Sequence, residues 1–522
     1  MLAGPERRAP VNPPKLVVLL VVDQMRADYV DQFGANWKKG LRRLLDKGSQ
    51  FTQAAYPYWN TVTCPGHATI ATGSLPSTHG MILNAWWDRA AGKQVNCTDD
   101  AGFSSVTGAG ARSTGQSPKN LRVATLADTM RAQRGPATRV VTLSLKARSA
   151  IGLAGHGGDA VVWFSGGAWT TSTFYGEKLP SFVERYGREH PVEASLGKSW
   201  TKLLPESAYV YADDAEGEVP PSGGTRTFPH LISTVSDWVN SPFSDVALGE
   251  LAQAAVKELH LGKGQGTDFL GVSFSALDEV GHDYGPRSHE VQDVLARLDV
   301  TIGNLLDFLD RAVGRNNYVV ALTADHGVAP IPEQMRAEGK DAGRVRPNDF
   351  AGVAKVLESY FGPGQHIQRI LYTEMYLALG IYAKLQTNPE ALRRVKEGIL
   401  KVPGVWRVYQ AEELEGRKAD DDPATRAAAL GYFAGRGGDL IVLSKLYWLT
   451  SSAATTHGTG HPYDVRVPVI LMGRMFRPGK YAAAATPADI APTLASVMGV
   501  QMPEADGRVL SEALRAKAGG KP

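Results

Sequence analysis

Residues 15–23, KLVVLLVVD, form a strongly apolar stretch close to the start of the chain that ends in a carboxylate. The apolar run is too short to cross a bilayer, and its Val and Leu residues are typical of a strand buried on both faces of a parallel sheet. Ligands of open α/β sheets bind outside the carboxyl ends of the strands. Asp23 is therefore the first candidate residue for a functional site.

Further apolar runs rich in Val, Ile and Leu alternate along the chain with segments of helical periodicity. The predicted strands cover residues 16–23, 139–144, 269–275, 318–323, 439–443 and 467–472. A helix is predicted over residues 291–313, where apolar residues such as Leu298 and Leu305 form one stripe. This alternation predicts an α/β fold with a mostly parallel central sheet and helices on both faces.

The length of 522 residues predicts one large domain that carries insertions. We place the main domain at residues 15–522. An insertion is predicted at residues 86–240, which are rich in Gly, Ser and aromatic side chains. A second is predicted at residues 331–438, where strand-like runs flank a helix and indicate a small α/β cap subdomain.

Charge and cysteine content narrow the classes of partner. The net charge is +3 and there is no dense run of Lys or Arg, so nothing favours a nucleic-acid or membrane partner. We expect small-molecule partners, and a monomer is the working expectation. Cys64 and Cys97 are compatible with one disulfide or with two free thiols. Residues 1–14 are polar and Pro-rich and do not resemble a signal peptide, which leaves the location open.

Carboxylates, imidazoles and one hydroxyl recur at or near the predicted strand ends. The candidates are Asp23, Thr63 in TVTCPGH (61–67), Asp278, His282, Asp325, His326 and His457. Asp278 and His282 are four residues apart, so on a helical turn both would face one ion. Together, three Asp and three His supply three ligands to each of two zinc-sized ions. The other nine histidines, including His67 and His461, are interpreted as structural or exposed.

Thr63 stands directly before a predicted helix with Pro65 in its first turn. A hydroxyl at this position commonly caps the helix by accepting a backbone N–H. The same helix terminus is also an anion-binding site. The two interpretations of Thr63, as a cap and as a functional hydroxyl, are compatible.

These motifs resemble the alkaline phosphatase superfamily, and within it the phosphate-irrepressible, threonine-nucleophile enzymes called PafA-type. The resemblance spans nearly the whole chain. It includes Asn84 in LNAWWD (83–88), Lys146 and Arg148 in KAR (146–148), and the closing segments DIAPTL (489–494) and DGR (506–508). It implies two Zn²⁺ ions per chain, one held by Asp278, His282 and His457 and the other by Asp23, Asp325, His326 and Thr63. It also implies a periplasmic or secreted protein.

The resemblance further implies hydrolysis of phosphate monoesters through a phospho-threonine at Thr63. A Thr hydroxyl is too weakly acidic to react at neutral pH, and a bound metal would activate it. A monoester dianion leaves charged non-bridging oxygens, which Asn84, Lys146 and Arg148 can bind. These three residues distinguish a monoesterase, because a diester places a second substituent where they need an oxygen.

Three alternatives remain open from the sequence. The nearest is a phosphodiesterase or nucleotide pyrophosphatase of the same superfamily, which shares both metal sites. A relative of the cofactor-independent phosphoglycerate mutases fits the Thr63 segment less well. A catalytically silent metal-binding or phosphate-binding protein is disfavoured because every ligand type is intact. Additional calcium sites at acidic loops such as residues 213–216 are also left open.

Overall fold

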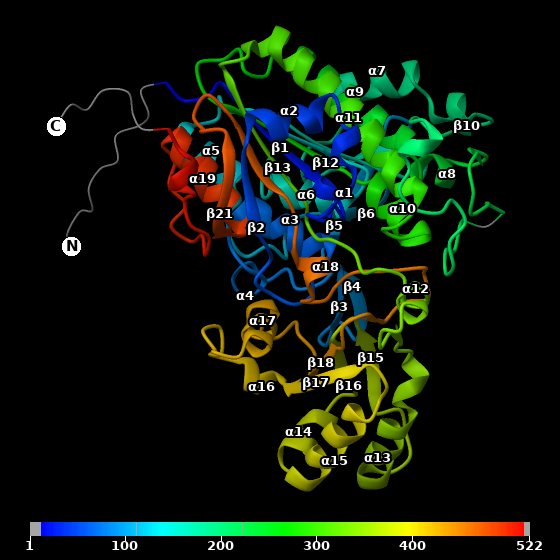
Figure 1. Cartoon of the computed structure of the whole chain (residues 1–522). Helices are drawn as coiled ribbons and strands as arrows, with labels where there is room; N and C mark the ends of the chain where they lie inside the picture. The colour runs from blue at the N-terminus through cyan, green and yellow to red at the C-terminus, as the bar shows by residue number, and fades with distance from the viewer. Residues whose placement is uncertain (1–11, 111, 222, 516–522) are drawn as a thin grey trace, which may run out of the picture.

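The computed structural model describes residues 12–515 except 111 and 222, and its centre is an eleven-stranded mixed sheet (Figure 1). In spatial order the strands are β21 (Gly479–Ala485), β2 (Ser49–Ala54), β20 (Val469–Gly473), β13 (Tyr318–Thr323), β1 (Leu16–Val22), β12 (Asp268–Phe274), β7 (Val140–Ser144), β8 (Ala160–Ser165), β9 (Ala168–Ser172), β5 (Asp99–Thr107) and β6 (Arg112–Gln116). The predicted α/β class is confirmed. The strand predicted at residues 16–23 is present as β1.

The middle of the sheet is a run of five parallel strands, β13, β1, β12, β7 and β8. Leu16 of β1 pairs with Asp268 on one side and with Tyr318 on the other, so the three strands start level and end level. Every residue of β1 is buried, as expected for a strand covered on both faces. The carboxyl ends of these strands therefore meet at one edge of the sheet.

Helices cover both faces of this sheet, because alternate residues of β1 point to opposite sides. Leu16, Val18, Leu20 and Val22 pack in one core with helices α2 (Gly40–Lys47), α9 (Pro242–Glu258) and α11 (His289–Leu309). Val17, Leu19 and Val21 pack in a second core with α3 (Thr63–Thr72), α5 (Leu126–Arg134) and α19 (Ile490–Met498). The two-faced burial predicted from the run of Val and Leu is thus confirmed.

Three features differ from the simplest form of the prediction. The strand predicted at 467–472 is β20, which runs antiparallel to both of its neighbours. The strand predicted at 439–443 is β18 (Leu440–Ser444), which lies outside the central sheet. Residues 86–240, for which an insertion is predicted, supply strands β5 to β9 of the central sheet.

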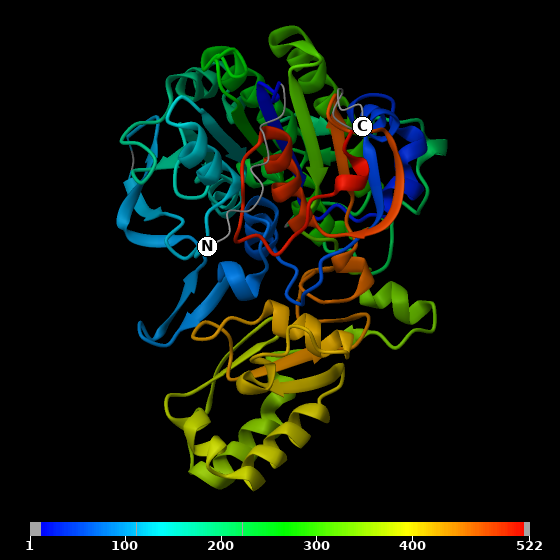
Figure 2. The ribbon, with the colours of Figure 1, turned by 90° about the vertical axis from the view of Figure 1, so that its left-hand side faces the viewer.

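A second, smaller sheet lies beyond the carboxyl edge of the central one (Figures 1 and 2). Its strand order is β15 (Ile367–Leu371), β16 (Glu374–Leu377), β18 and β17 (Val405–Gln410). Helices α13 (Ala351–Phe361), α14 (Ile381–Gln386) and α15 (Pro389–Leu400) pack on its outer face around a hydrophobic core of their own. We call these elements, residues 351–444, the cap.

Among the residues that the structure describes, no helix has both the length and the apolar character needed to cross a membrane.

Helix α3 approaches the end of β13 closely because residue 66 is a glycine. A Cβ added at Gly66 would press against the backbone oxygen of Asp325 and lie 2.7 Å from the Asp325 Cβ. The absence of a side chain at Gly66 therefore allows Thr63 and Asp325 to lie in the same site.

We expect Gly66→Ala to destabilise the fold by about 1–3 kcal/mol, because the new methyl group must displace backbone. The control is Gly352→Ala in α13, where an added Cβ meets nothing within 4 Å. That variant should stay within about 1 kcal/mol of the parent, in the stabilising direction. Chemical denaturation of both variants measures the difference, and equal stabilities would contradict the close-approach argument.

Candidate metal centre

The ends of four parallel strands deliver charged side chains to one place. Asp23 directly follows β1, and Asp325 lies two residues beyond the end of β13. Asp278 lies in the first turn of α10 (Ala276–Tyr284), the helix that follows β12. Lys146 follows β7 and is the N-cap residue of α6 (Ala147–Ala154). The parallel register is the reason why residues far apart in sequence become neighbours here.

Two groups of three residues could each hold a metal ion. We call Asp278, His282 and His457 the first triad, and Asp23, Asp325 and His326 the second triad; in each, the candidate ligand atoms all lie within 4.8 Å of one another. In the first triad, Asp278 Oδ1 is 3.3 Å from His282 Nε2 and 3.6 Å from His457 Nε2. In the second, His326 Nε2 is 3.3 Å from both Asp23 Oδ1 and Asp325 Oδ2. The sequence-based pairing of these six residues is the pairing that the geometry brings together.

All three imidazoles are oriented by backbone carbonyls. Nδ1 of His282 lies 3.0 Å from the Thr455 carbonyl, Nδ1 of His457 lies 2.9 Å from that of Thr61, and Nδ1 of His326 lies 3.0 Å from that of Gly327. Because a carbonyl oxygen only accepts, each Nδ1 must carry a proton, which in the neutral imidazole leaves the Nε2 lone pair free. This arrangement is typical of metal-ligating histidines.

The carboxylates also fit a cation. Asp23 Oδ1 and Asp325 Oδ2 are buried and have no hydrogen-bond partner among the described residues. Burial raises the pKa of Asp23, and the neighbouring Asp278 and Asp325 carboxylates raise it further. A metal ion would offset the repulsion between these groups and use the free oxygens. The donor set of carboxylate oxygen and imidazole nitrogen suits zinc and similar divalent ions.

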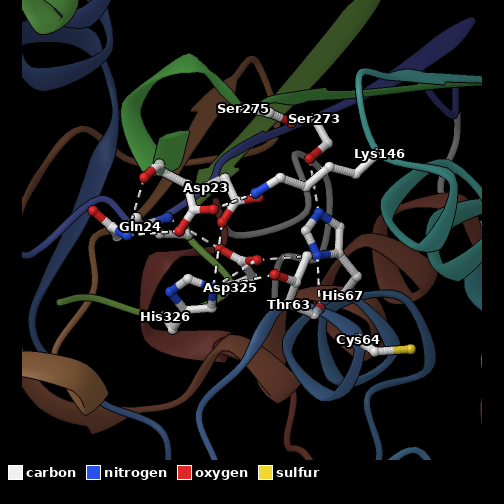
Figure 3. A network of polar contacts seen from close by, with 12 residues as sticks. Asp23, Gln24, Thr63, Cys64, His67, Lys146, Ser273, Ser275, Asp325 and His326 are labelled. Atoms are coloured by element: carbon white, nitrogen blue, oxygen red, sulfur yellow. Dashed lines mark hydrogen bonds and ion pairs between the residues drawn. The ribbon is translucent and has the colours of Figure 1, made fainter. Parts of the chain in front are cut away.

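Lys146 connects the two triads. Its Nζ donates to Asp23 Oδ2 at 2.8 Å (Figure 3). It also donates to Asp278 Oδ2 and lies 3.4 Å from Glu279 Oε1. Burial by itself would lower the pKa of the Lys146 ammonium, but the Asp23 and Asp278 carboxylates outweigh it and raise that pKa. Lys146 is therefore a fixed positive charge at the edge of the site.

Thr63 is the first residue of α3, directly after the N-cap residue Val62. Its buried hydroxyl lies 3.5 Å from His326 Nε2, beside the second triad. Figure 3 shows Thr63, His67 and His326 gathered around Asp325. The Thr63 hydroxyl thus faces the candidate metal site at a helix N-terminus, where the helix dipole favours negative charge.

Asn84 is fixed to the same helix. Its Oδ1 accepts the Cys64 backbone N–H at 2.7 Å, and its backbone carbonyl accepts the Cys97 N–H at 2.9 Å. A disulfide joins Cys64 to Cys97, which answers the question the sequence left open. Since the backbone N–H must face the amide oxygen, the Asn84 Nδ2 is left as a donor, without an acceptor among the described residues. The Thr63 segment therefore carries a free amide donor beside it.

Arg148 is a half-buried guanidinium two residues after Lys146 in α6. Its Nε is buried without a hydrogen-bond partner, and no carboxylate among the described residues pairs with it. Its charge acts on Lys146 and on Tyr372 of the cap. An arginine left unpaired in a partly buried setting is suited to bind an anion bidentately.

Two residues that the sequence did not single out support the ligands. Gln24, whose backbone has a positive φ of 70°, donates its Nε2 to Asp278 Oδ1 at 2.6 Å and its N–H to Asp325 Oδ1 at 3.2 Å, so it touches both triads. His67 places Nδ1 2.9 Å from the Thr63 carbonyl and 3.2 Å from Asp325 Oδ2, while its Nε2 lies 2.7 Å from Ser273 Oγ. The four-residue spacing of Thr63 and His67 on one helix was the available signal.

His461, unlike His67, contacts none of the six candidate ligands in the described structure. His461 Nε2 lies 3.0 Å from the Ser444 carbonyl, and its ring packs against Trp59. The structural interpretation of His461 agrees with these contacts.

Comparisons with known proteins place this chain in a family. The model of the family called type I phosphodiesterase / nucleotide pyrophosphatase matches residues 17–464. The chain is 32% identical to alkaline phosphatase PafA of Elizabethkingia meningoseptica, over 98% of this chain and 97% of that protein. It is 30% identical to alkaline phosphatase PhoV of Synechococcus elongatus, over 96% of this chain and 93% of that protein.

Solved structures also show similarity to PafA. The crystal structure of wild-type PafA superposes with a TM-score of 0.91, covering 97% of this chain and 100% of that one, at 32% identity. A solved PafA variant carries substitutions at a threonine, an asparagine, a lysine and an arginine. Those four positions have the same order and the same spacing along the chain as Thr63, Asn84, Lys146 and Arg148 here. Murine ectonucleotide pyrophosphatase / phosphodiesterase 5 shares the fold at a TM-score of 0.56 and 15% identity.

The role of His67 can be tested by a pair of substitutions. We expect His67→Phe to weaken metal binding by roughly 10- to 100-fold, because the ring volume is kept while the polar Nδ1 atom 3.2 Å from Asp325 Oδ2 is lost. His67→Asn keeps a donor near the position of Nδ1 and should lose much less. Competition with a chromogenic chelator measures both affinities; equal losses in the two variants would show that His67 acts only through packing.

Proposed function

The chain belongs to the type I phosphodiesterase / nucleotide pyrophosphatase family and to its PafA-type alkaline phosphatases, and we propose that it hydrolyses phosphate monoesters with two zinc ions and Thr63 as nucleophile. The alternative within the family is a phosphodiesterase or nucleotide pyrophosphatase. The observation that favours a monoesterase is the set of unpaired donors, the Arg148 guanidinium and the Asn84 Nδ2, near the Thr63 hydroxyl and Lys146.

The first triad would hold one zinc ion and the second triad the other, with Thr63 beside the second. When bound, the ions would lower the pKa of the Thr63 hydroxyl and offset the charge that develops on the leaving oxygen. His67 and Gln24 hold Asp325 and Asp278 in place for this task. The gathering of the Thr63 hydroxyl and six ligands at one sheet edge is what supports a hydrolase.

In the proposed reaction Thr63 Oγ1 attacks phosphorus, the bond to the leaving oxygen breaks, and a phospho-threonine forms. Water then attacks phosphorus from the opposite direction, which releases inorganic phosphate and restores the Thr63 hydroxyl. The Arg148 guanidinium, the Lys146 ammonium and the Asn84 amide would donate to the non-bridging oxygens through both steps. A monoester carries the charged oxygens that these donors need, whereas a diester replaces one with an ester group.

The Cys64–Cys97 disulfide supports the proposed location. Disulfides persist in the periplasm and outside the cell and are rare in the reducing cytoplasm. The bond joins Cys64, which directly follows the proposed nucleophile Thr63, to Cys97, whose backbone N–H donates to the Asn84 carbonyl. A periplasmic or secreted enzyme that acts as a monomer on small phosphate esters is the form we propose.

A pair of chromogenic esters tests the substrate class. At alkaline pH we expect the monoester to be cleaved much faster than the bis-ester, and a chelator to abolish both activities. Arg148→Ala should lower monoester kcat/KM by roughly 10²-fold and bis-ester kcat/KM far less. Arg148 is the better probe because Lys146 also touches two metal-ligand carboxylates.

The matched control for this test is Arg188→Ala, which removes an exposed arginine on α7 (Ser181–Glu189) and should change neither activity. Bis-ester turnover equal to or faster than monoester turnover would establish the phosphodiesterase alternative.

The nucleophile is tested by Thr63→Ala and Thr63→Ser. We expect Thr63→Ala to lower kcat by roughly 10³-fold or more, because the group that forms the covalent intermediate is gone. Thr63→Ser keeps a hydroxyl and should retain substantial activity. Elemental analysis should find about the same metal content in all three proteins, and near-normal turnover by Thr63→Ala would reduce Thr63 to a structural residue.

A further inference from the structure

The turn that connects β15 to β16 places an aromatic side chain in an unusual backbone conformation. Leu371 pairs with Glu374 across the two strands, so Tyr372 and Thr373 are the two residues of the hairpin loop. Tyr372 has a φ of 53°, at the first loop position, where glycine is strongly preferred in a loop of this kind. A bulky residue at positive φ costs free energy and is retained only where its surroundings hold it.

The surroundings of this loop are polar, buried and directed at the Thr63 segment. Thr373 Oγ1 donates to Asn60 Oδ1 at 2.7 Å, and Asn60 Nδ2 donates to Glu374 Oε1 at 2.9 Å. Glu374 is itself buried and accepts the Gly438 N–H at 2.7 Å. The tip of the cap is therefore fixed to a residue three positions before Thr63.

The ring of Tyr372 lies against the backbone that follows His457. A Cβ added at Gly458 would lie 2.8 Å from the Tyr372 Cδ1 and 3.1 Å from its Cε1. Tyr372 and His457 line one small cavity together with residues of the cap and of the loop before α18 (Pro462–Val465), among them Val442, Trp448 and Leu449. The ring thus borders the first triad, whose proposed metal ion would lie on the side of the leaving oxygen.

The charged groups of the site also act on Tyr372. Burial raises the pKa of the Tyr372 hydroxyl, and the charges of Arg148, Asp278 and Lys146 all act on that group. Among the described residues the hydroxyl has no hydrogen-bond partner, while the ring packs against a hydrophobic cluster that includes Val62 and Tyr376. The ring is therefore held beside His457, within reach of the charges of Arg148 and Lys146.

We propose that the Tyr372 ring is a specificity-determining contact for the leaving group, and that it makes the enzyme favour phosphate monoesters of aromatic or other flat apolar alcohols. This inference rests on the proposed phosphatase function and names the substrate class of the same site. The ring offers a flat apolar surface next to the first triad, which an aryl group can stack on and a short alkyl group cannot cover.

The test compares two monoesters, an aryl phosphate and a fluoroalkyl phosphate with a leaving-group pKa as close as possible. The measured quantity is the ratio of their kcat/KM values in the metal-loaded enzyme. Tyr372→Gly suits the positive φ and removes the ring, so it should lower the ratio by about tenfold through loss of the aryl substrate alone. Tyr372→Phe keeps the ring and should keep the ratio.

Tyr447→Gly is the matched control, because Tyr447 also has a positive φ, of 65°, and lines a different cavity. It should leave the ratio unchanged. Should Tyr372→Gly fail to fold, Tyr372→Leu gives the same comparison, since it keeps an apolar side chain without a ring. An unchanged ratio in the folded ring-free variant, or an equal loss on both esters, overturns the inference about Tyr372. Absence of any monoester turnover by the parent protein would instead overturn the proposed function.

Discussion

Three aspartate side chains are buried at one edge of the central sheet, and the rest of the site must compensate their negative charge. Asp23, Asp278 and Asp325 are all buried, and the Asp278 and Asp325 carboxylates raise the pKa of Asp23. Each is compensated by a separate element: Lys146 at the start of α6, Gln24 after β1, and His67 on α3. Divalent ions in the two triads would complete this compensation, so the same charges that destabilise the bare site create its affinity for metal.

The central sheet could be predicted from the sequence because burial on both faces leaves a clear mark. The runs that became β1, β12 and β13 consist mostly of apolar residues and are fully buried. Strand direction and strand partners leave no such mark, which is why the antiparallel β20 and the placement of β18 in the cap were not predicted. Within residues 86–240 the Gly-rich and Ser-rich composition also concealed β9, which pairs with β8.

The six candidate ligands could be picked out from the sequence because carboxylates and imidazoles recur at or near the predicted strand ends. Supporting residues could not, since their roles depend on the tertiary neighbours that they meet. His67 is an ordinary helix residue until α3 packs against the end of β13, and Gln24 acquires its two acceptors only when α10 and β13 are in place. The Cys64–Cys97 bond also required the fold, because the sequence gives the number of thiols but not the 6.7 Å between their Cα atoms.

Residues 60–63 connect the cap to both triads. Asn60 is held by the cap through Thr373 and Glu374, the Thr61 carbonyl orients His457, and Thr63 begins the helix that faces the second triad. Four consecutive residues thus contact the cap, the first triad and the second. Because this backbone has little freedom to adjust one contact without the others, a cap that shifted relative to the sheet would also move His457 and Thr63. A separately packed cap can therefore influence turnover without contributing any ligand to either triad.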